Sequence, residues 1–119
     1  MDTVPSTWCV LNVDGTVTHQ PGEPTHVAIR RALAGYAPQR IDLDDAVNQR
    51  IAAWRAEVTG QDAVANYPGR ALLAGHLAGP TALLGPIVLA GIDGEGLPED
   101  ILEKLTGYDQ RARARAVSE

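Results

Sequence analysis

The N-terminal part of the chain consists of short apolar runs separated by turn-forming residues, a pattern typical of β-strands joined by tight turns. Two β-prone runs, 8–13 and 16–20, flank Asp14-Gly15. An Asp-Gly pair between such runs predicts a two-residue type I′ hairpin turn, because that turn needs positive φ at both central residues. A turn of this kind would place Leu11 opposite Thr18 on the partner strand.

Three later segments carry apolar residues at helical spacing. The first begins after Thr25, a favourable N-cap residue, and runs to about Ala34, with Gly35 suited to the left-handed position after its end. The other two cover about 69–77 and 97–107. Each segment therefore predicts a short helix that packs its apolar face against the rest of the domain.

Two further apolar runs, 37–43 and 83–92, indicate strands, whereas residues 44–58 are ambiguous. The apolar positions of the ambiguous segment fall on a helical stripe that includes Trp54, but alternate positions around Trp54 also fit a strand. The pattern favours a helix, and the strand stays open as the alternative.

The order of these elements predicts one α+β domain over residues 1–119. We expect a small mixed or antiparallel sheet that starts with the N-terminal β-hairpin and packs with two to three helices. The first residues, 1–6, and the polar tail, 109–119, are expected to fray, because chain ends without packing partners are rarely ordered.

Length and composition fit one globular domain of the cytoplasm. The chain has 119 residues, 45% of them hydrophobic, and a net charge of -5. That charge argues against broad nonspecific binding to nucleic acid, which needs a concentrated positive surface. Cys9 is the single cysteine, so no internal disulfide is expected and a reducing compartment fits. The longest apolar run, 82–92, is too short to cross a bilayer, and the first residues lack the features of a signal peptide.

Residues 9–19, CVLNVDGTVTH, are one letter away from the first motif of haloacid-dehalogenase-like phosphatases. In those enzymes the first carboxylate of Asp-x-Asp-Gly-Thr attacks phosphorus. This chain has Asn12 at that position, and an amide cannot form the aspartyl-phosphate intermediate. We therefore interpret the motif as a hairpin turn and, with no other nucleophile motif in the chain, predict no catalytic residues.

No metal or cofactor site is predicted. Cys9 and the three histidines do not show the paired spacing of zinc sites. The acidic stretches 42–45 and 93–100 lack the alternating ligands of a calcium loop. The glycine-rich segment 91–96 precedes a predicted helix, where phosphate groups often bind, but the acidic residues there would repel a phosphate.

The basic cluster of the C-terminal tail, Arg111, Arg113 and Arg115, is a candidate binding surface. If this segment is helical, Arg111 and Arg115 share a face and Arg113 points nearly opposite. The helix dipole alone explains cations near the end of a helix. The functional alternative is a contact with nucleic acid or with an acidic partner.

Three more residues, Trp54, Asn66 and Arg70, are candidates for a binding site, and each also has a structural explanation. Trp54 fits the core. Asn66 can hydrogen-bond to the backbone at a turn before Pro68, and Arg70 can lay its stem along apolar surface. In the functional alternative, Asn66, Arg70 and an acidic residue line a shared groove.

Several short motifs of the chain occur together in one known family. They are the N-terminal hairpin, the helix end Ala34-Gly35-Tyr36, the segment around Trp54, NYPGRA (66–71), LGPIVLAG (84–91) and Leu97-Pro98. Over most of residues 8–105 the chain resembles the domain-of-unknown-function family numbered 3846. Its members are small proteins of phages, plasmids and conjugative elements without an established activity, and they often carry a second glycine where this chain has Ala34. The resemblance implies that Trp54 lies on a strand followed by a turn at 59–62, against the helix favoured above.

Together these features predict a non-catalytic accessory protein of a phage or other mobile element, which binds an unidentified protein partner and modulates a host process in the host cytoplasm. One alternative is a nucleic-acid-associated factor that uses the Arg-rich tail, which the acidic balance does not favour. The other is an uncharacterised small enzyme with a groove near Asn66 and Arg70. The sequence leaves open whether the domain pairs with itself.

Overall fold

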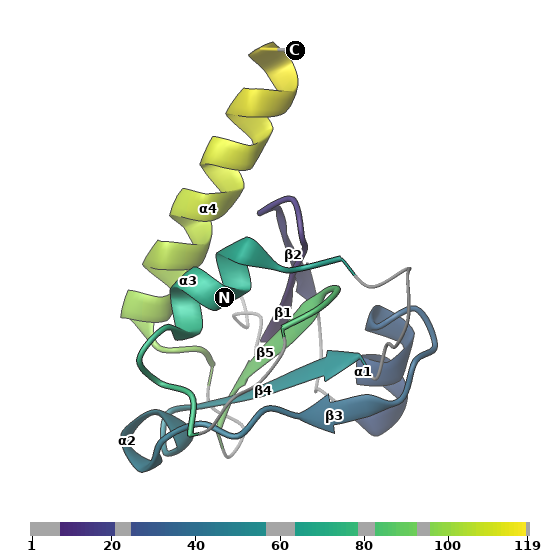
Figure 1. Cartoon of the computed structure of the whole chain (residues 1–119), viewed down its shortest axis with the longest axis vertical. Coiled ribbons are helices and arrows are strands. Elements are labelled where there is room, and N and C mark those ends of the chain that lie inside the picture. The colour runs from purple at the N-terminus through teal and green to yellow at the C-terminus, as the bar shows by residue number, and fades with distance from the viewer. Residues whose placement is uncertain (1–7, 21–24, 57–63, 79–82, 93–95, 119) are drawn as a thin grey trace, which may run out of the picture.

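Five antiparallel strands form one sheet in the order β2-β1-β5-β4-β3 (Figure 1). The structure is a computed structural model and describes residues 8–20, 25–56, 64–78, 83–92 and 96–118. The strands are β1 (Trp8–Leu11), β2 (Val17–Gln20), β3 (Pro38–Arg40), β4 (Ile51–Ala56) and β5 (Ile87–Gly91). The hairpin of β1 and β2 therefore lies at one side of the sheet, and β3 forms the opposite edge.

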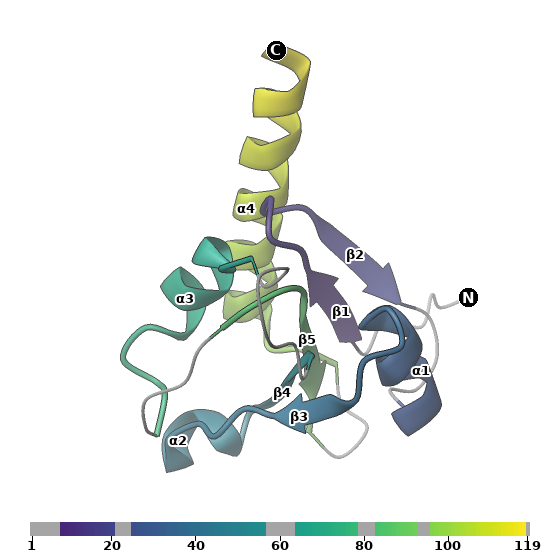
Figure 2. The ribbon, with the colours of Figure 1, turned by 45° about the vertical axis from the view of Figure 1, so that its right-hand side comes forward.

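Four helices are present in the described part of the chain, and they cover both faces of the sheet (Figures 1 and 2). They are α1 (His26–Ala32), α2 (Asp45–Asn48), α3 (Tyr67–Leu73) and α4 (Glu99–Ser118). One face packs against α1, and the other packs against α3 and α4. The predicted α+β class with an N-terminal hairpin is confirmed, with an antiparallel sheet and one helix more than expected.

The central strands β1 and β5 are buried on both faces because helices lie on both sides of the sheet. In β1, Cys9 and Leu11 belong to the core cluster under α3 and α4, whereas Trp8 and Val10 belong to the cluster under α1. A strand that is covered on both faces has no polar side. Continuous apolar runs, rather than an alternation of apolar and polar residues, are therefore what these strands require.

The hairpin turn between β1 and β2 has three residues, 13–15, rather than the two predicted. Asn12 N donates to Thr16 O (2.9 Å), and Gly15 N donates to Asn12 O (3.0 Å). Gly15 is the residue of this loop with a positive φ, +95°. The pattern is that of a type I turn followed by a left-handed glycine, a frequent three-residue hairpin.

The longer turn shifts the pairing of the two strands by one residue. Leu11 lies opposite Val17, where a two-residue turn would have placed Thr18. Since a slip of one residue exchanges the faces of a strand, the observed register is the one that sends Val17 into the core beside Leu11. The predicted register was wrong because an Asp-Gly pair fits either turn, and the burial of Val17 decides between them.

The ambiguous segment 44–58 divides into a short helix, α2, and a strand, β4. The helix favoured by the apolar pattern is therefore wrong over Ile51–Ala56, and 57–58 lie outside the described residues. Strand β4 lies between β3 and β5, and this pairing on both sides outweighs the helix propensity of its alanines and arginine. Trp54 lies on this strand, in agreement with the family resemblance. The turn expected at 59–62 and the frayed start expected at 1–6 lie outside the described residues.

Helix α4 continues to its last described residue, so 109–118 are helical where a frayed tail was expected. Contacts with the hairpin hold this second half of the helix. Asp109 Oδ1 accepts from Val17 N (2.9 Å), and Ala112 is buried beside Gly15. The sequence did not indicate this packing, because the buried face here consists of one alanine and polar contacts instead of a hydrophobic stripe.

The end of α1 holds an alanine in a left-handed conformation. Ala34 has φ +59°, Gly35 N donates to Arg30 O (2.9 Å), and Ala34 N donates to Arg31 O (3.1 Å). This bonding pattern is a Schellman end with Ala34, and not the expected Gly35, at the C′ position. A left-handed backbone at a residue that has a Cβ costs about 1 kcal/mol.

We expect Ala34→Gly to raise the free energy of unfolding by about 0.5–1 kcal/mol, because glycine adopts the left-handed conformation without strain. Ala32→Gly, the same chemical change within the helical part of α1, should lower it by at least as much. Urea denaturation of both variants measures these changes. A loss of stability in Ala34→Gly would contradict the strained helix end.

Candidate functional site

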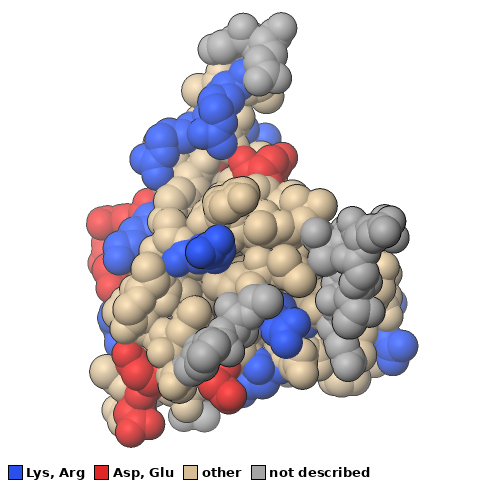
Figure 3. All heavy atoms as spheres, viewed as in Figure 1, with Lys and Arg blue, Asp and Glu red and all other residues tan. Residues whose placement is uncertain are grey.

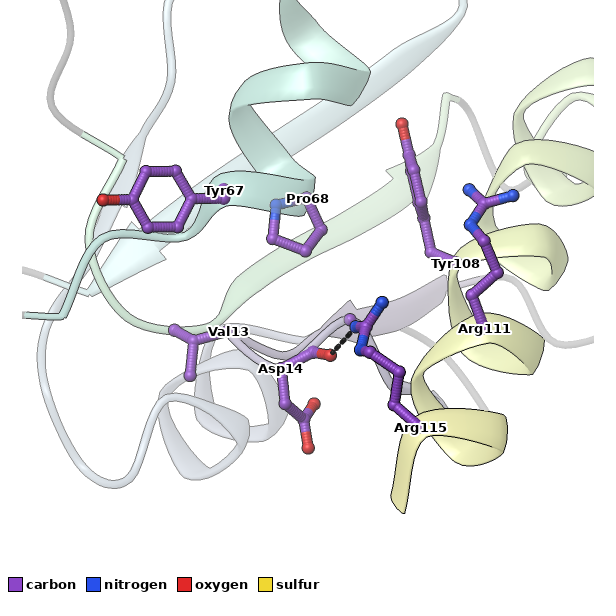
Figure 4. A pocket seen from close by; sticks show the side chains of 8 residues that line it. Val13, Asp14, Tyr67, Pro68, Tyr108, Arg111 and Arg115 are labelled. Atoms are coloured by element: carbon purple, nitrogen blue, oxygen red, sulfur yellow. Dashed lines mark hydrogen bonds between the residues drawn. The ribbon is translucent and has the colours of Figure 1, made fainter. Parts of the chain in front are cut away.

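An open groove of about 540 Å³ lies between the β1–β2 turn, the start of α3 and the second half of α4 (Figure 4). It is lined by Val13, Asp14 and Gly15 of the turn, Tyr67 and Pro68 of α3, and Tyr108, Arg111 and Arg115 of α4. We call it the turn–helix groove. Because its three segments meet only in the folded chain, no local sequence motif could reveal it.

A buried asparagine fixes the position of α3 beside the turn. Asn66 is 0% exposed, and its Oδ1 accepts from Gly69 N (2.8 Å) as the N-cap of α3. Its Nδ2 donates to Leu11 O (3.0 Å) and to Gly85 O (2.9 Å). The amide therefore joins α3 to the end of β1 and to the segment before β5, and it positions the groove without lining it.

The absence of a side chain at Gly69 lets α3 approach β5 closely. A Cβ there would overlap Cδ1 of Ile87 and would lie 3.1 Å from Oδ1 of Asn66. The first contact is closer than van der Waals packing allows, and the second is tighter than ordinary packing. A larger residue would therefore force the end of the Ile87 side chain and the Asn66 amide to shift.

The wall that α4 contributes to the groove presents one tyrosine and two arginines. Tyr108 and Arg111 lie side by side, with the guanidinium carbon 5.3 Å from the ring centre (Figure 4). Arg111 and Arg115 share this face, whereas Arg113 pairs with Asp109 at 2.9 Å. This arrangement agrees with the predicted division of the three arginines. In the described part of the chain, the two on the groove side have no carboxylate within ion-pair distance.

The carboxylate of Asp14 turns back on the hairpin instead of pairing with the arginines. Its Oδ1 accepts from Thr16 Oγ1 (2.6 Å) and from Thr16 N (2.9 Å), and these hydrogen bonds hold the pKa of Asp14 below its usual value. The backbone carbonyl of Asp14 accepts from Arg115 Nη2 (3.2 Å), as Figure 4 shows. The groove therefore keeps a positive balance along α4.

The surface beside the groove is basic. In Figure 3 Lys and Arg side chains gather on the helix that projects from the body of the molecule, the second half of α4. This half carries Arg111, Arg113 and Arg115. At the α3 side, the guanidinium carbon of Arg70 lies 5.9 Å from the ring centre of Tyr67. Each tyrosine of the groove thus has an arginine next to its ring.

The candidate residues predicted from the sequence divide between this region and the rest of the fold. Arg111 and Arg115 line the groove, and Arg70 lies next to it. Trp54 packs on the opposite face of the sheet, in the cluster under α1. Asn66 is buried and its amide is engaged, so it does not line a groove with Arg70.

Tyr67, Pro68 and Tyr108 were not recognised from the sequence. Tyr108 lies one helical turn before Arg111, a spacing that places both on one helix face, so this pair could have been found. Tyr67 and Pro68 gave no such signal, because only the packing of α3 against the hairpin brings them to the groove.

The described residues offer little for metal or thiol chemistry. In this part of the chain no three His, Cys, Asp or Glu side chains lie close enough together to hold an ion. Cys9 is buried, and burial raises the pKa of its thiol to about 12, so it remains protonated and unreactive at neutral pH. None of the described helices is long and apolar enough to cross a membrane.

Comparison of the chain with protein-family models, with curated protein sequences and with solved structures finds no match. The resemblance to the family numbered 3846 therefore stays a prediction that rests on its short motifs. The geometry of the groove is the basis for a proposal about function.

Asp109 links the hairpin to α4 at the edge of the groove. Hydrogen bonds from Arg113 and from Val17 N hold the pKa of Asp109 below its usual value. The ionised carboxylate of Asp109 therefore stabilises the folded state. This contribution is fully present above the unfolded-state pKa of about 4 and is lost as the pH falls through the lower folded-state pKa. We expect Asp109→Asn to lower the free energy of unfolding by about 1 kcal/mol at neutral pH and to reduce the loss of stability in acid.

Urea denaturation from neutral pH down to about pH 3 measures both effects of Asp109→Asn. Glu103→Gln removes an exposed carboxylate from the same helix and should leave the stability nearly unchanged. A stability profile of Asp109→Asn that coincides with that of the wild type would contradict this link.

Proposed function

We propose that this protein is a non-catalytic binding protein that contacts another protein through the turn–helix groove, and that the contacted segment is acidic. The observation that supports this most is the pair Arg111 and Arg115, which face the groove without a carboxylate partner in the described residues. A guanidinium group can bind a carboxylate through two parallel hydrogen bonds. Two such groups on one helix face therefore suit a segment with successive acidic side chains.

The aromatic lining adds apolar contact area to this basic wall. Tyr67 is 69% exposed, and Tyr108 and Pro68 also line the groove. Tyrosine and arginine are enriched among the residues that dominate the binding energy of protein interfaces. Tyrosine buries a large area while few torsion angles become fixed, so its loss of entropy on binding is small.

The shape of the groove favours an extended chain segment as its ligand. The groove is open to solvent, and its lining spans the turn, α3 and α4 (Figure 4). A peptide in an extended conformation can contact all three elements at once. Sites for small molecules, by contrast, usually enclose most of the surface of the ligand.

Single-stranded nucleic acid is the second candidate partner. Tyr108 and Arg111 form a pair of the kind on which unpaired bases stack, and the guanidinium of Arg115 could contact a phosphate. The net charge of -5 opposes the binding of a polyanion more strongly than it opposes the binding of a short acidic segment. We therefore place nucleic acid second.

The biological setting of this binding rests on the sequence resemblance alone. Members of the family that the chain resembles are small proteins of phages, plasmids and conjugative elements. The partner would then be a protein of the host or of the element with an exposed acidic segment, and binding would modulate a host process.

Titration of the isotope-labelled protein with a Glu-rich peptide, and separately with an oligodeoxythymidylate, tests the proposal by NMR. We expect the peptide to shift the amide signals of the turn–helix groove. Arg111→Ala and Arg115→Ala should each lower the affinity for the peptide by about tenfold, the equivalent of about 1.4 kcal/mol of binding free energy. Arg113→Ala removes a cation from the other side of the same helix and should bind the peptide as the wild type does.

Equal weakening by Arg113→Ala would indicate a response to net charge and would contradict recognition by the groove. Absence of binding at millimolar peptide would also contradict the proposal. Tighter binding of the oligonucleotide, with an affinity that falls steeply as salt is added, would favour the second candidate.

A further inference from the structure

A second cavity, of about 240 Å³, lies between α2, β4, the end of α3 and the first turns of α4. It is smaller and more enclosed than the turn–helix groove, and the two share no lining residue. Its walls come from three parts of the chain that are distant in the sequence: α2 with the adjoining start of β4, the end of α3, and the first turns of α4. We call it the α2–α4 cavity.

The floor of the α2–α4 cavity is part of the main hydrophobic core. Ile51, Leu72 and Leu73 are buried core residues, and Val47 and Ile101 pack against that core while still partly exposed. Water at such a floor finds few hydrogen-bond partners, so an apolar group that replaces it lowers the free energy. The cavity therefore favours a ligand with an apolar body.

The rim of the cavity carries more basic than acidic side chains. Arg50, His76 and Lys104 line it together with one acidic residue, Asp100. The carboxylate of Asp100 is already engaged by Arg50, whose two terminal nitrogens lie 2.6 and 3.2 Å from its oxygens. This ion pair neutralises one of the basic groups, Arg50.

Lys104 and His76 are the two donors that remain for a ligand. Lys104 has no acidic side chain within ion-pair distance among the described residues. His76 Nδ1 lies 3.8 Å from Asp44 Oδ2, which is within ion-pair distance but beyond hydrogen-bond distance, so this contact does not occupy an N–H of the ring. An apolar floor next to an unpaired ammonium group matches the two ends of an amphiphilic anion.

We infer that the α2–α4 cavity binds a small organic carboxylate, with its apolar body on the core floor and its carboxylate between Lys104 and His76. This site is separate from the proposed partner-binding groove and does not depend on it. Its volume is below the roughly 300 to 1,000 Å³ of most small-molecule sites, so the apolar body is a short alkyl chain or a single ring. Asp100 limits the charge of the ligand, because a dianionic phosphate would lie beside a carboxylate.

Octanoate is the probe for this site, and octanol and octylammonium, which have the same alkyl chain, are the controls for head-group charge. Methyl NMR signals of Val47, Leu72 and Ile101 report binding in the cavity. We expect octanoate to bind about tenfold more tightly than either control, and Lys104→Gln to remove this preference. Glu103→Gln, next to Lys104 in sequence but outside the cavity lining, should bind octanoate as the wild type does.

Asp100→Asn tests the same site by an expected gain in affinity for octanoate instead of a loss. It removes the acidic group of the lining and frees Arg50, so octanoate should bind about threefold to tenfold more tightly. Equal affinities for the three probes, or an affinity for octanoate that Lys104→Gln leaves unchanged, would overturn the inference. Methyl shifts confined to other parts of the protein, or no saturation at millimolar octanoate, would overturn it as well.

Discussion

The buried side-chain amide of Asn66 joins three segments that are far apart in the sequence, and the arrangement of the molecule depends on it. Its oxygen and nitrogen satisfy the N–H of Gly69 and the carbonyl groups of Leu11 and Gly85. Each buried group would cost about 1–3 kcal/mol if it lost its partner, so α3 cannot shift relative to β1 without a large penalty. The start of α3 and the hairpin turn that follows β1 are thereby held together, and the turn–helix groove lies between them.

Helix α4 forms a wall of both candidate sites. Its first turns contribute Asp100 and Lys104 to the α2–α4 cavity, and its second half contributes Arg111 and Arg115 to the turn–helix groove. At 1.5 Å per residue, the outermost of these positions are about 22 Å apart along the helix axis. The helix is continuous and is bonded to the hairpin through Asp109, so one rigid element fixes the separation of an apolar, enclosed site from an open, aromatic and basic one.

Features that a few neighbouring residues decide could be predicted from the sequence, whereas features decided by distant packing could not. The N-cap at Thr25 and the Asp-Gly hairpin depend on local chemistry, and both are present. The register of that hairpin depends on the burial of Val17 beneath α4, and the helical state of 109–118 depends on contacts back to the same hairpin. The basic face of α4 could be predicted from the helical spacing of its arginines. The groove did not, because Tyr67 reaches it only through the packing of α3.

Hydrogen exchange of the Asn66 side-chain amide tests its central role most directly. In the folded protein Nδ2 donates to the carbonyl oxygens of Leu11 and Gly85, and the side chain is buried. We therefore expect its two protons to exchange only on global unfolding, as slowly as the backbone amides of β1 and β5. Exchange at the rate of an exposed asparagine side chain, while the strand amides stay protected, would contradict this role.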